Sequence, residues 1–211
     1  YAAATIRSTI RRKLDAFLVP LKEHEPIFDS LALDFDSFDI DDLEKAISKL
    51  RIDRSIKRVD SFHGGTKEAK SHLETFLDSK LDRFPELRND PTLDYVSHMS
   101  PYLHFGQISP LYIALEVSKT GSPGIEAFLE ELIIRRELSM NFVFYNEKYD
   151  CFEAIPDWAK KTLKNHQKDK RSSLYSLKEL EGAKTHDPYW SAAQKEMLHT
   201  GKMHGYMRMY W

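Results

Sequence analysis

The first stretch able to do chemistry is "VSHMS", residues 96–100, which runs directly into Pro101. A serine followed by a proline often begins a helix, because serine caps free N–H groups and proline suits the first turn. We therefore predict one helix start at Ser100 and another at Ser109, with Gly106 ending the first helix in a left-handed conformation. Free N–H groups at such a start suit an anionic phosphate, although most starts of this kind only begin a helix.

A second candidate is the pair Glu131 and Arg135 in the apolar segment "GIEAFLEELIIRRELSMNFVFYN". Four residues apart on a helix, the two side chains share one face, together with Leu138 and Phe142. If that face is buried, both charges need partners, since burying an unpaired charge is costly. If it is a solvated edge, the two form an ordinary ion pair worth a few tenths of a kcal/mol. The residues leave both readings open, the second being the simpler.

The end of the sequence, "GKMHGYMRMYW", mixes aromatic, thioether and basic side chains and carries no capping residue after its last tryptophan. Other familiar chemistries find no support. The nine histidines show no metal spacing, and H-E-x-x-H, CxxC, G-x-S-x-G, P-loop and G-x-G-x-x-G patterns do not occur. Their absence argues against hydrolase, kinase and nicotinamide-dehydrogenase functions. His166, His186 and His199 are most simply surface or capping residues.

The elements that must position these groups are helices throughout, with no credible strand. Apolar spacing predicts a helix from Ile6 to Leu18, bounded by Pro20, and a short one after an Asp39 cap. A joint at residues 64–65 precedes a helix that Thr66 caps. Further signals are a capping box and a proline-initiated helix that ends at a glycine: Ser176 with Glu179, then Asp187-Pro188 and Gly201.

Composition places the chain among ordinary globular proteins. It has 211 residues, 41% hydrophobic and 30% charged, with a formal net charge of -2, so nucleic-acid binding would need a local basic face. The single cysteine, Cys151, excludes an internal disulfide framework and fits a reducing compartment. No run of about 18 apolar residues indicates a membrane span. Because the sequence starts at Tyr1 and stops without a cap, we expect an excerpt of a longer protein.

Three segments together resemble one family. "SHMSPYLHFGQIS", "FLEELIIRREL" and "THDPYWSAAQKEMLHTGKMHGYMRMYW" are similar, in order and spacing, to the flavin-binding helical domain of class II cyclobutane pyrimidine dimer photolyases. "RNDP" and "NEKYDCFEAIPDWAKKTLKNHQKD" strengthen the match, which is dense from about residue 65 onward. The resemblance implies an all-α fold: an incomplete helical FAD-binding domain over 65–211, preceded by a helical interdomain linker over 1–64. It also implies an earlier α/β domain that can hold an antenna chromophore, and a second part of the flavin domain after Trp211.

The resemblance assigns roles to individual residues. "VSHMS" matches the loop that grips the FAD phosphates and ribityl chain. Phe84 stands where relatives usually have a flavin-contacting tyrosine, so its ring can pack without donating a hydrogen bond. The positions implied to bind FAD are Phe84, Val96, Ser97, His98, Met99, Ser100, Arg135 and Arg208.

Other positions are implied to serve the lesion and electron transfer. Glu131 matches a glutamate that reaches the damaged bases, Met209 a methionine that packs on the flipped dimer, and Arg88 a lesion or phosphate contact. Trp190 and Trp211 match members of the tryptophan relay that photoreduces the flavin. Aromatic packing would be the usual explanation for such residues, but the family match favours the relay.

The function implied is light-driven repair of pyrimidine dimers in DNA by electron transfer from reduced FAD, with the damaged bases flipped into the pocket. The predicted partner is damaged DNA, held by phosphate contacts to which Lys160, Lys161, Lys164 and Lys168 are candidates, although a solvated helix face explains them equally well. We expect no metal, no membrane, a monomer, and an intracellular location, cytoplasmic in a prokaryote and nuclear in a eukaryote. Residues 1–211 alone should bind FAD weakly or not at all and lack repair activity.

Two alternatives remain open. A cryptochrome-like photoreceptor would keep the flavin and lose repair, which the retention of Glu131 and Met209 argues against. A helical scaffold or DNA-binding remnant would hold no cofactor and would show no flavin absorbance after reconstitution with FAD.

Overall fold

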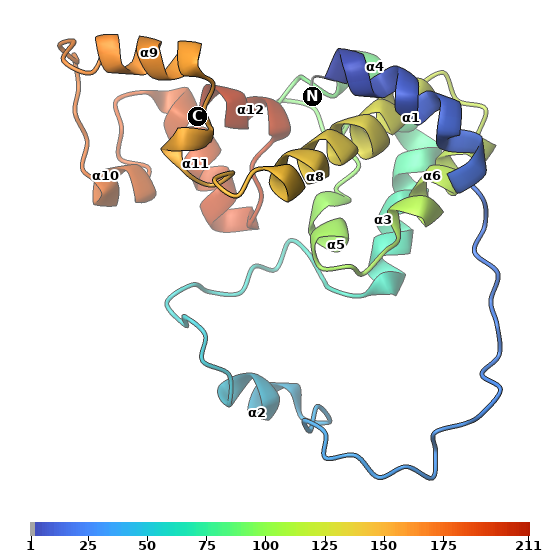
Figure 1. The fold of residues 1–211 in the computed structure, drawn as a ribbon. Coiled ribbons are helices and arrows are strands. Elements are labelled where there is room, and N and C mark those ends of the chain that lie inside the picture. The colour runs from blue at the N-terminus through green and yellow to red at the C-terminus, as the bar shows by residue number, and fades with distance from the viewer. Residues whose placement is uncertain (1–2) are drawn as a thin grey trace. The chain divides into compact units, whose positions relative to one another are not determined.

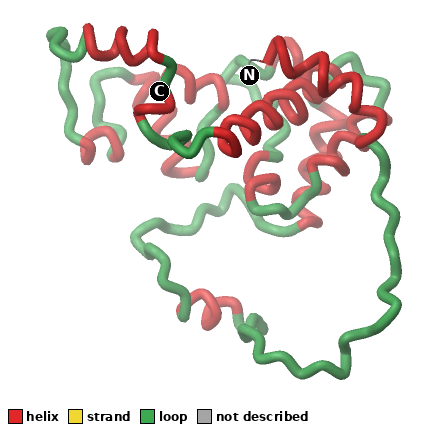
Figure 2. The backbone as a smooth tube through the Cα atoms, in the orientation of Figure 1, coloured by secondary structure: helices red, strands yellow, loops and turns green. Residues whose placement is uncertain are grey.

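The computed structural model describes residues 3–211, which form helices joined by loops and contain no strand (Figure 2). By its internal contacts the chain divides into two compact units, one made of residues 1–20 and 61–211 and the other of residues 21–60. The sequence placed a boundary near residue 64 and grouped the first helix with the linker. In the structure that helix belongs to the larger unit instead.

The smaller unit is mostly irregular chain with one helix, α2 (Leu43–Ser48). Its N-cap is Asp42, whose carboxylate accepts from the Lys45 N–H at 3.0 Å. The Asp39 cap predicted from the sequence is wrong, because that side chain accepts from the Asp41 N–H in a tight turn just before the helix.

The larger unit contains all the remaining helices (Figure 1). In chain order they are α1 (Ala3–Phe17), α3 (Thr66–Ser79), the 3₁₀ turn η1 (Leu81–Arg83), α4 (Phe84–Leu87), α5 (Ser100–His104), α6 (Pro110–Lys119), α7 (Ile125–Leu129), the π-helical turn η2 (Glu130–Arg135), α8 (Arg136–Tyr145), the 3₁₀ turn η3 (Phe152–Ala154), α9 (Asp157–Asn165), α10 (Leu177–Glu181), α11 (Pro188–Thr200) and α12 (Gly205–Tyr210).

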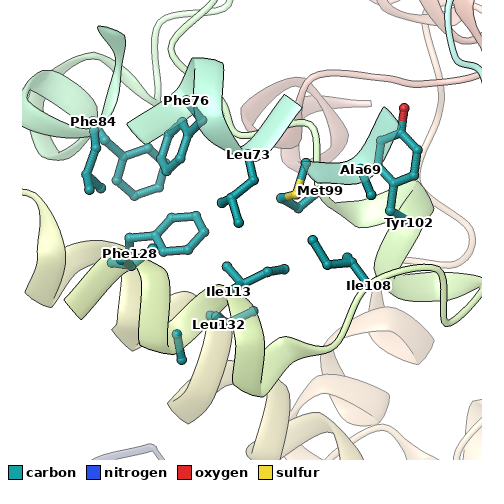
Figure 3. Close-up of a cluster of buried hydrophobic side chains, with 13 residues drawn as sticks. Ala69, Leu73, Phe76, Phe84, Met99, Tyr102, Ile108, Ile113, Phe128 and Leu132 are labelled. Atoms are coloured by element: carbon teal, nitrogen blue, oxygen red, sulfur yellow. The ribbon is translucent and has the colours of Figure 1, made fainter. Parts of the chain in front are cut away.

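The core of this unit lies where α3, α4, α6 and α7 meet (Figure 3). Three phenylalanine rings pack together there: Phe76 lies 4.9 Å from Phe128 and 5.6 Å from Phe84, and the last two are 5.5 Å apart. Such aromatic pairs add about 0.5–1.5 kcal/mol each beyond the area they bury. The cluster fixes α4 and α7, two of the elements that surround the site described below.

Several predicted helix ends are confirmed. The Ser109 hydroxyl accepts from Tyr112 at the start of α6, and the Ser176–Glu179 capping box is complete. Asp187 caps α11 through the Tyr189 and Trp190 N–H groups, and Gly201 ends it in the left-handed conformation at φ 73°. Gly106 likewise follows α5 at φ 65°.

Two predicted caps are wrong. Gly65, not Thr66, is the N-cap of α3, and the Thr66 hydroxyl instead donates to the Gln107 carbonyl at 2.9 Å. Ser100 is the first residue of α5, so Met99 occupies the cap position and no side chain caps this helix. The Ser97 hydroxyl stabilises the turn before α5 instead, because it accepts from the Met99 N–H.

Helices α7, η2 and α8 follow one another directly, and this long segment differs from the prediction in its middle. Residues Glu130–Arg135 adopt π-helical geometry, with hydrogen bonds from i to i+5, rather than α-helical geometry. Arg7 of α1 binds Glu130 through two nitrogens, at 2.6 Å and 3.0 Å, and thereby fastens α1 to the π turn. Among the described residues, no helix combines the length and apolar character needed to cross a bilayer.

Candidate functional site

The candidate site is a cavity of about 540 Å³ in the larger unit. It lies between α4, the loop before α5, the α7–η2 segment and the chain from residue 202 to α12. Its lining residues are Phe84, Arg88, Asn89, Val96, Ser97, His98, Met99, Ser100, Phe128, Glu131, Lys202, Gly205, Tyr206, Arg208 and Met209. A second hollow of about 400 Å³ shares Ser97, Met99, Ser100, Phe128 and Glu131 with it.

Almost every position that the sequence assigned to cofactor or lesion therefore lines this one cavity. The structure brings together the cofactor positions Phe84, Val96, Ser97, His98, Met99, Ser100 and Arg208 with the lesion positions Arg88, Glu131 and Met209. They come from segments separated by more than half the length of the chain, and only the folded core brings them together.

Arg135 is the exception. It lines neither hollow, its side chain is 55% exposed, and its closest carboxylate is Glu130 at 3.9 Å. The predicted i,i+4 pairing with Glu131 does not form, because hydrogen bonds in the π turn run from i to i+5. The residue five positions after Glu131 is Arg136, which lines the smaller hollow beside it.

Glu131 pairs instead with Arg88. An Arg88 Nη atom lies 2.8 Å from a Glu131 carboxylate oxygen, and the guanidinium stacks over the Phe84 ring at 5.2 Å. The Nε–H of Arg88 is buried and meets no acceptor in the described chain. A buried donor without a partner is costly, so this N–H is available to a group that enters the cavity.

The loop before α5 presents a row of charged and polar groups. Lys202 Nζ lies 2.8 Å from His98 Nδ1, His98 Nε2 lies 2.6 Å from Asp94, and the other Asp94 oxygen lies 2.7 Å from Lys80 Nζ. An ammonium group has no acceptor, so His98 Nδ1 must be the acceptor and the His98 proton sits on Nε2, facing Asp94. His98 itself has φ 55°, a conformation uncommon for a residue other than glycine.

Burial and charge set the protonation of these groups. Burial lowers the pKa of Lys202 to about 8, with Arg208 and Lys80 adding repulsion against the attraction of Asp94 and Glu196. Burial and the neighbouring Lys202 charge lower the pKa of His98, which keeps its ring neutral. For Asp94, burial opposes ionisation, but hydrogen bonds from Lys80 and His98 outweigh it and lower the pKa.

The two tryptophans named from the sequence lie outside the cavity lining and stack on each other. Their ring centroids are 5.8 Å apart and their planes are 16° from parallel. The Trp190 indole N–H donates to the main-chain oxygen of Trp211 at 3.1 Å, and the Trp211 indole N–H donates to the Gln194 side chain at 3.0 Å. The pair thus links α11 to the residue that follows α12.

The cavity has the chemistry of an anion site with an apolar wall. Lys202, Arg88 and Arg208 supply positive charge, Ser97 and Ser100 supply hydroxyls, and Phe84, Met99 and Phe128 supply apolar surface. Within residues 3–211 no carboxylate pairs with Arg208, and no group of three histidine, cysteine or acidic side chains could hold a metal ion. A large ligand with both a phosphate group and an aromatic ring fits such a lining.

Comparison with known proteins identifies the family of the chain. No protein-family model matches the chain. It is 50% identical over all 211 residues to the deoxyribodipyrimidine photo-lyase of Methanothermobacter thermautotrophicus, 42% identical to that of Potorous tridactylus and 40% to that of Oryza sativa, again over the whole chain. The chain belongs to the deoxyribodipyrimidine photo-lyase family.

The match covers less than half of each photo-lyase: 46%, 40% and 43% of the three relatives, respectively. Among solved structures, a class III photolyase from Agrobacterium tumefaciens aligns with a TM-score of 0.53 and 23% identity, over 72% of this chain and 30% of the other. At that identity the likeness concerns the fold, and it confirms the predicted all-α photolyase fold.

The sequence did not point to several of the residues that line the cavity. Lys202 and Tyr206 stand inside the quoted segment "GKMHGYMRMYW", and Asn89 inside "RNDP", so the motifs contained them without marking them. Arg136 was not singled out because α-helical spacing pairs Glu131 with Arg135, four residues later, whereas the segment is π-helical. The pairing of Lys202 with His98 joins residues 104 positions apart and leaves no local signal.

Proposed function

We propose that this chain forms the first part of the FAD pocket of a light-driven class II cyclobutane pyrimidine dimer photolyase. One observation carries the proposal: a single cavity joins anion-binding groups to Glu131, Arg88 and Met209. The 50% identity to a protein named deoxyribodipyrimidine photo-lyase supports the reaction class. The activity belongs to the intact protein, which would split a dimer flipped out of the duplex.

The lining residues fit FAD. Ser97, Ser100 and Lys202 would hold its phosphates, and Arg208 would lie near the polar edge of its ring system. Phe84 would pack against the cofactor without a hydrogen bond. When bound, reduced FAD supplies the light-driven electron; this chain positions it, excludes water and provides charge. Arg135 remains proposed as a cofactor contact only if its exposed side chain turns toward the ligand.

Other residues of the same lining are proposed to receive the lesion. Glu131 stands where it could hydrogen-bond the base edges, and Arg88 holds its carboxylate at 2.8 Å. A carboxylate placed in this way can bind the imide N–H of a pyrimidine and stabilise charge while the ring opens. Met209 is 76% exposed at the cavity edge, where a polarisable thioether suits an irregular apolar ligand.

The stacked indoles are proposed as part of the path that reduces the flavin. Two nearly parallel rings 5.8 Å apart favour electron transfer between Trp190 and Trp211. DNA is proposed to lie along basic groups that include the exposed Lys161, Lys164 and Lys168 on and after α9. Lys160 is already paired with Asp157 at 3.2 Å, which makes it the weaker candidate.

The test is a segment exchange. Residues 1–211 replace the aligned segment of the Methanothermobacter relative, and the purified chimera is reconstituted with FAD and given an oligonucleotide that contains one thymine dimer. We expect flavin absorbance and dimer cleavage under blue light, with none in the dark. Bound flavin without cleavage would favour a photoreceptor, and a chimera that folds but holds no flavin would refute the cofactor assignment.

A further inference from the structure

The side chain that holds the Trp211 indole is Gln194, in α11. It is 4% exposed, and its amide oxygen accepts from the Trp211 indole N–H at 3.0 Å. Its amide nitrogen donates to the main-chain oxygen of Glu181, at the end of α10, at 3.1 Å. One buried side chain therefore connects α10, α11 and the tryptophan stack.

The orientation of the Gln194 amide follows from its two neighbours. A main-chain carbonyl only accepts, so it must face the amide NH₂ group, and an indole N–H only donates, so it must face the amide oxygen. Turning the amide over would set two donors against each other and two acceptors against each other. The hydrogen-bond network therefore places the neutral amide oxygen of Gln194, and not its NH₂ group, against the Trp211 indole N–H.

That oxygen has a chemical consequence when the indole is oxidised. Loss of one electron turns an indole into a radical cation whose N–H is strongly acidic. A carboxylate or water at the nitrogen can take the proton and leave a neutral radical, whereas an amide oxygen is far too weak a base to do so. It still stabilises the cation as a charge-assisted acceptor.

Neither the Asp187 nor the Glu181 carboxylate accepts from the Trp211 indole nitrogen. The Asp187 carboxylate accepts from the Tyr210 hydroxyl and from two N–H groups at the start of α11, which lowers its pKa. The same hydrogen bond to Asp187 raises the pKa of Tyr210. Glu181 meets Gln194 through its main-chain oxygen.

We propose that Gln194 is a positioning residue that keeps the proton on Trp211 during electron transfer. When one electron leaves Trp211, no bond breaks and the proton stays on Nε1; in the intact protein a photo-excited oxidised flavin would be the electron acceptor. The positive charge can then pass to Trp190 as a pure electron step, without waiting for a proton to return. This inference rests on the tryptophan relay of the proposed function.

The test uses residues 1–211 without flavin and with a short Gly-Ser extension after Trp211, so its outcome is independent of repair. The extension keeps the oxygen that accepts from the Trp190 indole N–H a neutral carbonyl, because a terminal carboxylate at that place would take the proton from oxidised Trp190. Trp158 is 75% exposed and would also be oxidised, so Trp158→Phe is the background that leaves the stacked pair as the only tryptophans. A photo-oxidised ruthenium complex in solution takes the electron, and transient absorption distinguishes the indole radical cation from the neutral radical. Near-ultraviolet circular dichroism verifies that the stack is intact in each variant.

With Gln194 present, we expect the radical cation to form and its lifetime to be independent of pH. In Gln194→Glu, a buried carboxyl replaces the amide with little change of shape. As pH rises and this carboxyl ionises, the cation lifetime should fall by about tenfold or more, a barrier lower by at least about 1.4 kcal/mol. Gln167→Glu adds the same group at an exposed position and should leave the lifetime unchanged.

Gln194→Met supplies a second arm if the carboxyl variant loses the stack. It keeps the volume but offers no carbonyl acceptor, so we expect a lower yield of the cation at equal oxidant concentration. The proposal is overturned if the original chain already gives the neutral radical, or if Gln194→Glu and Gln194→Met both match it in yield and lifetime. Failure of the flavin-loaded chimera to repair DNA would contradict the proposed function and leave this result standing.

Discussion

Lys202 illustrates, at the scale of single residues, how a cavity can hold a positive charge at a cost. Its amine is half-buried beside Arg208 and Lys80, and its one strong contact is to a neutral histidine. In the absence of an anion the charge is poorly compensated, which is why burial lowers its pKa to about 8. A phosphate at this position would restore the compensation and raise that pKa again.

This arrangement predicts a pH-dependent difference between the original chain and Lys202→Met. The folded amine loses its proton near pH 8 and the unfolded amine near 10.5, so between these values the unfolded state binds more protons. The free energy of unfolding should therefore rise with pH in that window, relative to the variant, by up to about 3 kcal/mol. Urea unfolding at pH 7 and at pH 10 measures it.

The pH range in which the free energy of unfolding rises also depends on Asp94, because the Asp94 charge raises the Lys202 pKa. Asp94→Asn should move the rise to lower pH, because the amine then loses its nearest attractive charge. His98 does not interfere above pH 7, since its pKa lies below the usual 6.5. If the difference in free energy of unfolding between the original chain and Lys202→Met stays constant from pH 7 to 10, then Lys202 is better solvated than the structure indicates.

Glu131 carries the second residue-scale prediction. In the segment-exchange chimera, Glu131→Gln should lower the yield of dimer cleavage by about 10- to 100-fold, the range expected when a positioned acid–base group is lost. FAD content should not change, because we propose that Glu131 contacts the lesion and not the cofactor. Glu147→Gln, at an exposed turn outside the cavity lining, is the matched control. Equal yields in all three proteins would remove Glu131 from the mechanism.

How much the sequence could foresee differs between these residues. The loop at 96–100 was predictable because its signal is local: serines, a proline and a known spacing. The Lys202–His98 contact was not, because it depends on how the chain after α11 folds back on the loop. The protonation of both residues follows from that contact and from burial, which no local pattern encodes.

At the scale of elements, the π turn at Glu130–Arg135 changes which side chains meet. Apolar spacing predicts a helix here, and a helix forms, but its middle is π-helical, and Arg136 rather than Arg135 lines the same hollow as Glu131. The sequence does not reveal the turn, because its stability comes from tertiary contacts. Arg7 of α1 grips Glu130, and the Arg7 hydrogen bond lowers the Glu130 pKa. π turns of this kind are frequent at functional sites.

Gly124 gives the prediction for this scale, because it precedes α7 where that helix meets η1. A Cβ at this position would overlap the main-chain oxygen of Leu81, which cannot move aside as a flexible side chain could. Gly124→Ala should cost about 3 kcal/mol, at the upper end for overpacking, and displace α7 from the phenylalanine cluster. Urea unfolding of the chain measures the loss.

Gly121→Ala is the control for Gly124→Ala. Gly121 has φ 70°, and no neighbouring atom lies within 4 Å of the place that a Cβ would occupy, so only backbone strain opposes the alanine. Its cost should be about 1 kcal/mol. Equal costs at the two glycines would mean that the α7–η1 contact is looser than the structure shows.

At the scale of the whole molecule, the sequence predicted the all-α fold and most helix ends but not the division into units. Capping boxes, proline starts and left-handed glycines are local, so Ser176, Asp187 and Gly201 were assigned correctly. The place of α1 depends on a contact between residues 7 and 130, which spacing along the chain does not show. The cavity likewise depends on contacts between distant residues, so family resemblance predicted its residues and the apolar periodicity of the helices did not.

The last prediction concerns FAD and residues 1–211 by themselves. The cavity offers groups for phosphates, but Arg208 has no carboxylate partner in the described residues, and large apolar side chains such as Phe144 and Tyr145 are 80% and 73% exposed. The chain also matches less than half of each relative. We therefore expect FAD to bind more weakly than a dissociation constant of about 1 µM, which corresponds to about −8.2 kcal/mol.

Titration of FAD fluorescence against residues 1–211 and against the chimera measures this difference directly. The chimera should bind at least about tenfold more tightly, a gain of about 1.4 kcal/mol, if the rest of the relative supplies further contacts to the cofactor, as we propose. Lys202→Met should weaken FAD binding in both proteins if its amine contacts a phosphate. Micromolar or tighter binding by residues 1–211 alone would show that the groups lining this one cavity suffice to hold the cofactor.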